Sequence, residues 1–142
     1  LMHSRLFQTV SLSQMRTLTR TLQNMETYLD NKVVIQEIHL NEYDVKDSNI
    51  RDMEQMQHDF HRSVEEVECV VILRELPDGK IRVSIRSKSQ VDIGALMRSV
   101  GGGGHSRAAG VAWEGPIGNV KKRILNLLKK GLEIYPISRS TS

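Results

Sequence analysis

The sequence predicts an α/β (α+β) domain with a small mixed β-sheet of about four strands and flanking helices. The 142 residues are 39% hydrophobic and 26% charged, which is typical of one globular domain. Segments with apolar residues every three or four positions alternate with short β-branched segments, in the order helix, strand, helix, two strands, helix, strand, helix. Two of the strands are joined by a tight-turn sequence, Leu-Pro-Asp-Gly at residues 76–79.

The N-terminal part predicts two helices separated by a strand. Helical spacing of apolar residues extends over residues 11–29, and Ser11 or Ser13 can cap this helix. The β-branched residues of 32–40 favour a strand. Asp-Ser-Asn at residues 47–49 can cap a second helix. The apolar side of that helix consists of Ile50, Met53, Phe60 and Val64.

A β-hairpin follows. Residues 69–76 and 80–88 are strand-like, and Pro77 occupies the second position of a type I turn between them. Strict alternation in the second strand places apolar residues on one face. The opposite face carries Arg82, Ser84, Arg86 and Lys88. Three cations and a hydroxyl therefore share one face of the predicted sheet.

The C-terminal third predicts a short helix, a strand and a final helix. Asp92 caps the short helix and Gly101 ends it. Its core positions are Ile93, Leu96, Met97 and Val100. Residues 110–114 form the strand, Asn119 caps the last helix, and Gly131 closes it.

Charge and cysteine content narrow the functional classes. The net charge of +3 favours a partner that carries phosphate. The single cysteine, Cys69, excludes an internal disulfide and favours the reducing cytoplasm, and we expect it to be a small core residue. Apolar runs are too short to span a membrane. The start at Leu1-Met2 suggests a piece of a longer protein.

The run GGGGHSRAAG at residues 101–110 has two interpretations. A bare glycine run most often marks a flexible joint or close backbone packing. Alternatively, it forms a glycine-rich phosphate loop, in which backbone amides approach an anion and His105 and Arg107 donate to it. The second interpretation is favoured by His105, although Arg107, like Arg82, fits a surface charge better. The Lys-Ser/Thr ending of a Walker loop is absent.

This run resembles a known family when it is read with SIRSK at residues 84–88 and VDIGAL at residues 91–96. The combination resembles the DHH-associated C-terminal domain of DHH-family phosphoesterases, in particular bacterial nanoRNases that also dephosphorylate adenosine 3′,5′-bisphosphate. The resemblance is strongest over residues 70–128. It implies three parts: residues 1–30 as a helical connector from an N-terminal catalytic domain, 31–137 as the substrate-binding domain, and 138–142 as a disordered tail.

The resemblance also implies roles for individual residues. His105 matches the histidine at the catalytic cleft. The implied phosphate contacts are Gly102, Gly103, Gly104, Arg86, Ser87, Lys88 and Arg74. For Arg74, a pair with Glu75 or a solvated position is an equal alternative.

The family uses two Mn²⁺ ions, which are held by an N-terminal domain with an Asp-His-His motif that this chain lacks. We therefore expect no metal ligands in this chain and no activity from it alone. The expected partners are the N-terminal DHH domain and short RNA oligonucleotides or 3′-phosphorylated nucleotides; a homodimer stays open.

Three other interpretations need weighing. A phosphodiesterase for cyclic or linear dinucleotides would keep the same fold. A non-catalytic RNA-binding module, as at the end of alanyl-tRNA synthetases, is a different class, and the Gly-His junction at His105 argues against it. His58 and His61 are one helical turn apart and could begin a metal site, but a solvated helix face is the better interpretation.

Overall fold

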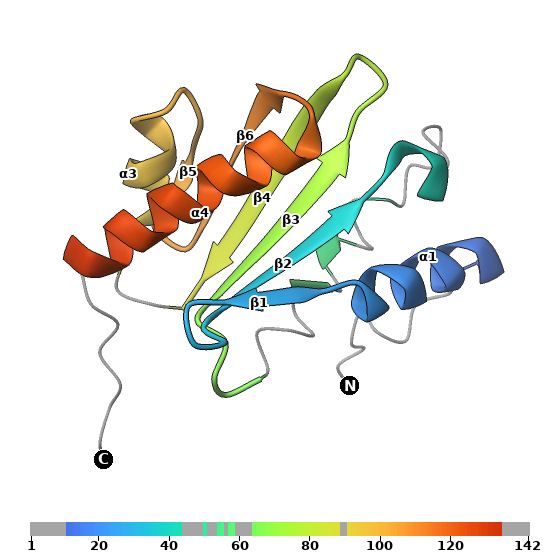
Figure 1. Ribbon diagram of the computed structural model, residues 1–142, viewed down its shortest axis with the longest axis horizontal. Helices are drawn as coiled ribbons and strands as arrows, with labels where there is room; N and C mark the ends of the chain where they lie inside the picture. The colour runs from blue at the N-terminus through green and yellow to red at the C-terminus, as the bar shows by residue number, and fades with distance from the viewer. Residues whose placement is uncertain are drawn as a thin grey trace, which may run out of the picture.

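The computed structural model describes residues 11–43, 50, 54–55, 57–58, 64–88 and 91–134. These form one mixed six-stranded sheet with the order β1-β2-β3-β4-β6-β5 (Figure 1). The strands are β1 (Glu26–Tyr28), β2 (Val33–Ile38), β3 (Cys69–Glu75), β4 (Lys80–Ser87), β5 (Gly103–His105) and β6 (Ala108–Glu114). β2 and β3 are parallel, and the other neighbouring strands are antiparallel. The α+β fold class is confirmed.

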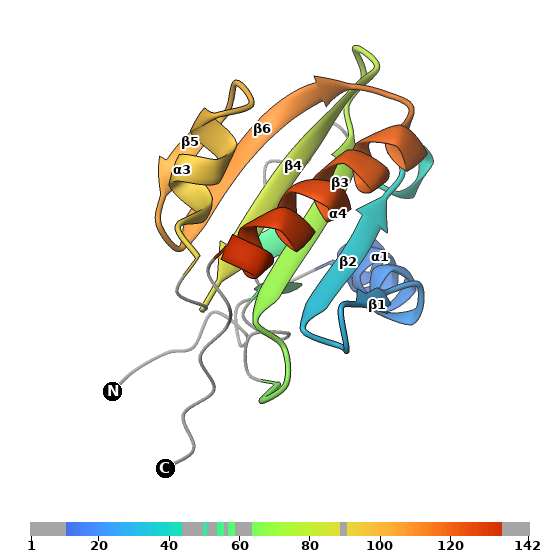
Figure 2. The ribbon, with the colours of Figure 1, turned by 60° about the vertical axis from the view of Figure 1, so that its left-hand side comes forward.

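Helices lie on both faces of this sheet. The helical elements are α1 (Leu12–Gln23), the 3₁₀ turn η2 (Leu40–Glu42), α3 (Ile93–Arg98) and α4 (Ile117–Ile134). α4 crosses one face over β3 and β4, and α3 lies beside β5 (Figures 1 and 2). The main core lies between this face and the two helices, and includes Val71, Val83, Met97 and Ile124.

The opposite face of the sheet has a smaller apolar cluster and more polar contacts. Val34, Val70 and Ile72 are buried there. The Gln36 amide is also buried and donates to the carbonyl of Thr21 in α1 at 2.8 Å. Residues 54–55 and 57–58 cover the same face through contacts with β3 and β4, so both faces are covered.

The predicted hairpin is confirmed. The Gly79 N–H donates to the Leu76 carbonyl at 3.0 Å, as expected for the Pro-Asp turn. Ile81, Val83 and Ile85 are buried in the main core, and Arg82 on the alternate face is exposed. The alternation in sequence therefore identified correctly which face of β4 is apolar.

The first predicted helix is too long. It ends at Gln23, and residues 26–28 form β1, which pairs with β2. The reversal between them places Leu29, Asp30 and Asn31 at φ values of 54°, 58° and 63°. The helical spacing of apolar residues continues through residue 29 in the sequence. Residues 26–28 nevertheless form a strand, because they pair with the edge of β2, and the local pattern does not show that contact.

The sheet has six strands rather than about four, because β1 and β5 are added at its edges. Gly103 and Gly104 belong to β5 instead of a loop, and the strand predicted at 110–114 begins at Ala108. α4 begins at Ile117, before Asn119, and continues past Gly131, which packs against Leu96 and Val91. Asn119 therefore does not cap α4, and Gly131 does not close it.

The second predicted helix is described only in part. Residues 54, 55, 57 and 58 are helical, whereas the proposed caps, Met53, Phe60 and His61 lie outside the described residues, as does the tail at 138–142. Ile50 is buried, as expected, but Val64 is 42% exposed. None of the helices in the described ranges combines the length and the apolarity needed to cross a bilayer.

Candidate phosphate-binding site

The strand register brings the two sequence motifs together at one end of the sheet. β6 lies between β4 and β5, and Ala108 is opposite both Arg86 and His105. Residues opposite one another share a face of a sheet, so Arg86, Ala108 and His105 form a row across three strands, with Arg86 and His105 about 10 Å apart. The Ser87 N–H also donates to the Arg107 carbonyl at 3.0 Å.

The glycines of this motif are required for different reasons. A Cβ at Gly104 would lie 2.4 Å from the Cα of Ala109, and its φ of 137° is unfavourable for other residues. A Cβ at Gly102 would lie 2.4 Å from the Gly110 carbonyl oxygen. Gly103 has nothing within 4 Å of a Cβ. Close packing, the more conservative interpretation, explains Gly102 and Gly104, whereas Gly101, at a φ of 89°, and Gly103 both face open space.

α3 holds the β5–β6 turn in place. Asp92 caps α3 by accepting from the Ala95 N–H at 3.0 Å, as predicted. The Ile93 N–H donates to the Ser106 carbonyl at 3.1 Å, and Arg98 Nη1 donates to the Gly104 carbonyl at 2.8 Å. His105 and Arg107 therefore project, exposed, from a turn that is fixed on two sides.

Arg74 is not a surface cation. Its side chain is 9% exposed, and its Nε donates to Glu54 Oε2 at 3.1 Å. Burial opposes the charged guanidinium, but Glu54 and Tyr43 outweigh it and raise the pKa of Arg74. The pair is with Glu54 rather than Glu75, and a phosphate contact by Arg74 would require this pair to separate.

The three residues of the Arg-Ser-Lys sequence also have partners. Arg86 Nη2 donates to Gln55 Oε1 at 2.8 Å, and Lys88 Nζ donates to the Val64 carbonyl at 2.9 Å. Ser87 is buried, and its Oγ accepts from Cys69 Sγ at 3.4 Å. Arg86 and Lys88 remain half-buried, so both reach the surface beside the β5–β6 turn.

Residues 54–55 and 57–58 form a wall of the site that the sequence did not reveal. His58 is 1% exposed and lies 3.1 Å from Ser84 Oγ through its Nε2. The prediction of a solvated face at His58 was wrong, because the helix places it against the polar face of β4. The sequence did contain one signal for this contact, namely the three cations and the hydroxyl predicted on one face of β4. When another element covers such a polar face, it must supply polar partners. Cys69 is fully buried in the core, as expected.

The described residues offer no ready metal centre: within those ranges, no three His, Cys, Asp or Glu side chains are grouped suitably. The exposed groups at the site are instead hydrogen-bond donors, namely His105, Arg107 and the half-buried Arg86 and Lys88. Such donors suit an anion with several oxygen acceptors.

Comparisons with known proteins agree with the fold and identify a family. The DHHA1 domain family matches residues 30–133. An exopolyphosphatase-related protein from Bacteroides fragilis has a similar structure, with a TM-score of 0.69 and 23% identity, over 91% of this chain and 36% of that protein. No curated protein sequence matches the chain.

Two further structures share the fold at lower identity. A pGpG-specific phosphodiesterase, PggH, from Vibrio cholerae has a TM-score of 0.57 and 14% identity, over 85% of this chain and 39% of that one. The C-Ala domain of alanyl-tRNA synthetase from Aquifex aeolicus has a TM-score of 0.50 and 19% identity, over 74% of this chain and 97% of that one. The chain thus spans little more than a third of the first two proteins. Because the family match covers residues 30–133, including both motifs of the site, the chain belongs to the DHHA1 domain family.

Proposed function

We propose that this chain is the substrate-binding domain of a Mn²⁺-dependent, cytoplasmic phosphoesterase that acts on short oligoribonucleotides or 3′-phosphorylated nucleotides. The observation that carries the proposal is the row Arg86–Ala108–His105, beside the open space at Gly103. Two donors flank a small alanine there, and a phosphate can approach the Gly103 backbone closely.

Each residue has a distinct role in this proposal. Arg86 anchors a phosphate with its guanidinium, and Lys88 adds charge at the same end of β4. His105 donates to the phosphate that reacts, where negative charge develops in the transition state. Arg74 and Ser87, which are buried, support this surface in the present conformation and would contact phosphate only after rearrangement.

The metal ions belong to another part of the enzyme in this proposal. The described residues provide no cluster that fits Mn²⁺, so we assign the ions to an N-terminal DHH domain and no metal-dependent step to this chain. When bound there, such ions supply a hydroxide nucleophile and neutralise the scissile phosphate. This domain then binds and orients the substrate.

The decisive experiment is steady-state kinetics of the intact phosphoesterase on a diribonucleotide. His105→Ala should lower kcat about a hundredfold, because one donor to the transition state is lost. Arg86→Ala should mainly raise KM, and Arg86→Lys should restore only part of the affinity. Arg82→Ala is the matched control, because Arg82 is exposed on the same face of β4 and lies away from the turn. Wild-type turnover by His105→Ala would overturn the proposal.

A second candidate keeps the site and changes the substrate to a linear or cyclic dinucleotide. It is favoured by the fold shared with the pGpG-specific phosphodiesterase. Competition between pGpG and a diribonucleotide of another sequence for the same intact enzyme separates the two candidates.

A non-catalytic RNA-binding module, which the C-Ala fold allows, is the third candidate. It predicts that folded RNA binds and that neither dinucleotide is cleaved. An Asp-His-His motif in the sequence upstream of Leu1 would count against it.

A further inference from the structure

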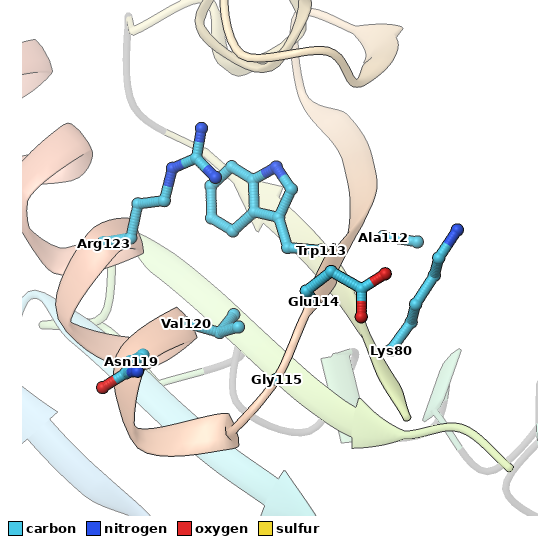
Figure 3. Close-up of a pocket in the computed structure, with 8 residues that line it drawn as sticks. All are labelled: Lys80, Ala112, Trp113, Glu114, Gly115, Asn119, Val120 and Arg123. Carbon is cyan, nitrogen blue, oxygen red and sulfur yellow. The ribbon is translucent and has the colours of Figure 1, made fainter. Parts of the chain in front are cut away.

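A pocket of about 490 Å³ opens between the end of β6 and the start of α4, far from His105. Its walls include Lys80, Glu114, Asn119 and Arg123 (Figure 3). Lys80 and Arg86 are six residues apart on β4, so the pocket is about 20 Å from the candidate site. A dinucleotide bound at His105 therefore cannot fill it.

Arg123 is held in this pocket by Trp113. Its guanidinium carbon lies 3.9 Å from the centre of the Trp113 ring (Figure 3). The ring is itself fixed, because it is 8% exposed and its Nε1 donates to the Val100 carbonyl at 3.3 Å. A guanidinium stacked on an indole keeps its N–H edge available for a phosphate in a restricted orientation.

The other polar groups of the pocket suit a nucleotide better than a bare anion. Lys80 adds a second cation, whereas Glu114 is an acceptor and would repel a ligand that is only negative. Asn119 can donate and accept. Arg123 can hold a phosphate on one side of Trp113, whereas Lys80 and Glu114 lie on the other side of the ring (Figure 3), where they can contact the neighbouring phosphate and base of an RNA strand.

α4 extends from this pocket with a basic face. Its exposed positions in this stretch are Gly118, Asn119, Lys122, Arg123, Asn126, Lys129 and Lys130. At 100° per residue, the four cations and two asparagines fall within about a third of the helix circumference. In the described part of the chain, no carboxylate pairs with these cations, whereas Lys121 on another side of the helix contacts both Glu26 and Glu37.

This face runs back toward the candidate site. The helix is about 27 Å long, and Gly131 near its end packs against Val91 and Leu96, next to the helix that holds β5. The exposed positions are polar or glycine, so the face has no apolar side to enter a bilayer, which disfavours a lipid surface. Phosphates repeated along a flexible strand match cations repeated along this helix.

We propose that the pocket at Arg123 and the basic face of α4 form a second RNA-binding surface, which holds nucleotides of an oligoribonucleotide remote from the end at His105. The proposal rests on the proposed function only in its choice of RNA for the site at His105. At about 3.4 Å per stacked nucleotide, a 12-mer spans both surfaces and a dinucleotide only one.

The test measures binding of fluorescein-labelled oligouridylate 12-mer and of a uridine dinucleotide to the 142-residue chain by fluorescence anisotropy and competition. Lys122→Gln/Lys129→Gln should weaken 12-mer binding about tenfold and reduce the salt slope of log K by about 1.4, because two phosphate contacts are lost. Arg16→Gln/Arg20→Gln, on the exposed side of α1, removes the same charge and should leave 12-mer binding unchanged. Equal losses from the two double variants would overturn the proposal, because only net charge would then matter.

The pocket has its own test. Arg123→Gln and Glu114→Gln should each weaken 12-mer binding, whereas inorganic polyphosphate should bind Glu114→Gln more tightly than wild type. Polyphosphate that binds wild type as tightly as the 12-mer, or anionic phosphatidylserine vesicles that bind more tightly, would overturn the assignment to RNA. Dinucleotide binding should change in none of these variants but should fall in Arg86→Ala, because Arg86 is the proposed phosphate anchor. Failure of that last result counts against the proposed function and leaves the α4 surface intact.

Discussion

Arg74 and Arg86 on the β3–β4 hairpin bond to side chains of residues 54 and 55, whereas His105 and Arg107 at the β5–β6 turn are exposed. In the sequence, both pairs consist of side chains that can donate hydrogen bonds to a phosphate. The difference arises from position, because the middle of a sheet face is covered by other elements and a turn at its edge is not. A covered cation must find a partner, since an unpaired buried charge is costly. Predictions of ligand contacts are therefore safer for the edge of this sheet than for its centre.

The largest effect on stability should come from breaking an ion pair in the covered part of the sheet. Arg74→Met leaves the Glu54 carboxylate buried without its partner, and should lower the free energy of unfolding by about 3–5 kcal/mol. Arg82→Met, at the residue opposite Arg74 in the ladder, should change it by less than about 0.5 kcal/mol because Arg82 is exposed. Urea unfolding followed by circular dichroism measures both.

The variant Arg74→Met/Glu54→Leu sharpens this test. Removing both charges should recover part of the loss, because no carboxylate is then left buried. A double variant as unstable as the sum of the two single variants would mean that the ion pair makes no separate contribution.

A smaller effect on stability should distinguish two neighbouring glycines of β5, beside the exposed β5–β6 turn. Gly104→Ala should cost about 1–3 kcal/mol, because its Cβ would clash with Ala109 and its φ is unfavourable. Gly103→Ala has open space and should unfold like wild type. If a phosphate approaches this backbone, Gly103→Ala should nevertheless weaken dinucleotide binding. Wild-type affinity in Gly103→Ala would remove Gly103 from the proposed site.

The smallest effect on stability should come from an ion-pair cluster on the surface, away from the hairpin arginines and from the β5–β6 turn. Lys121 Nζ lies 2.7 Å from Glu26 Oε1 and 3.0 Å from Glu37 Oε2, and ties α4 to β1 and β2. The hydrogen bond from Lys121 lowers the pKa of Glu26 and raises that of Lys121. Glu26 therefore adds stability above its unfolded pKa near 4.5, and this is lost as pH falls through its lower folded pKa.

Glu26→Gln should cost at most about 1 kcal/mol at pH 7, because the pair is partly exposed, and the difference from wild type should be smaller at pH 3. Urea unfolding at the two pH values measures this difference. A difference that is the same at both would show that the carboxylate charge is not involved.

The sequence by itself determined the elements with strong local signals. Alternation of apolar and polar residues identified the buried face of β4, the Pro-Asp-Gly turn joined β3 to β4, and Asp92 capped α3. It also carried the family resemblance, because the motifs around Arg86 and His105 are local runs of residues. These features depend on neighbours in the chain, and a single sequence records such neighbours directly.

Only the tertiary structure decided which residues meet. The short edge strands β1 and β5 exist because β2 and β6 offer open backbone groups, and their own residues, including two glycines, favour a strand only weakly. The burial of His58 and the pairing of Glu54 with Arg74, twenty residues apart, likewise depend on how a helix packs on the sheet. Burial and register are set by contacts between residues that are distant in sequence. An arginine can therefore be a structural partner at one position and a candidate phosphate ligand at another.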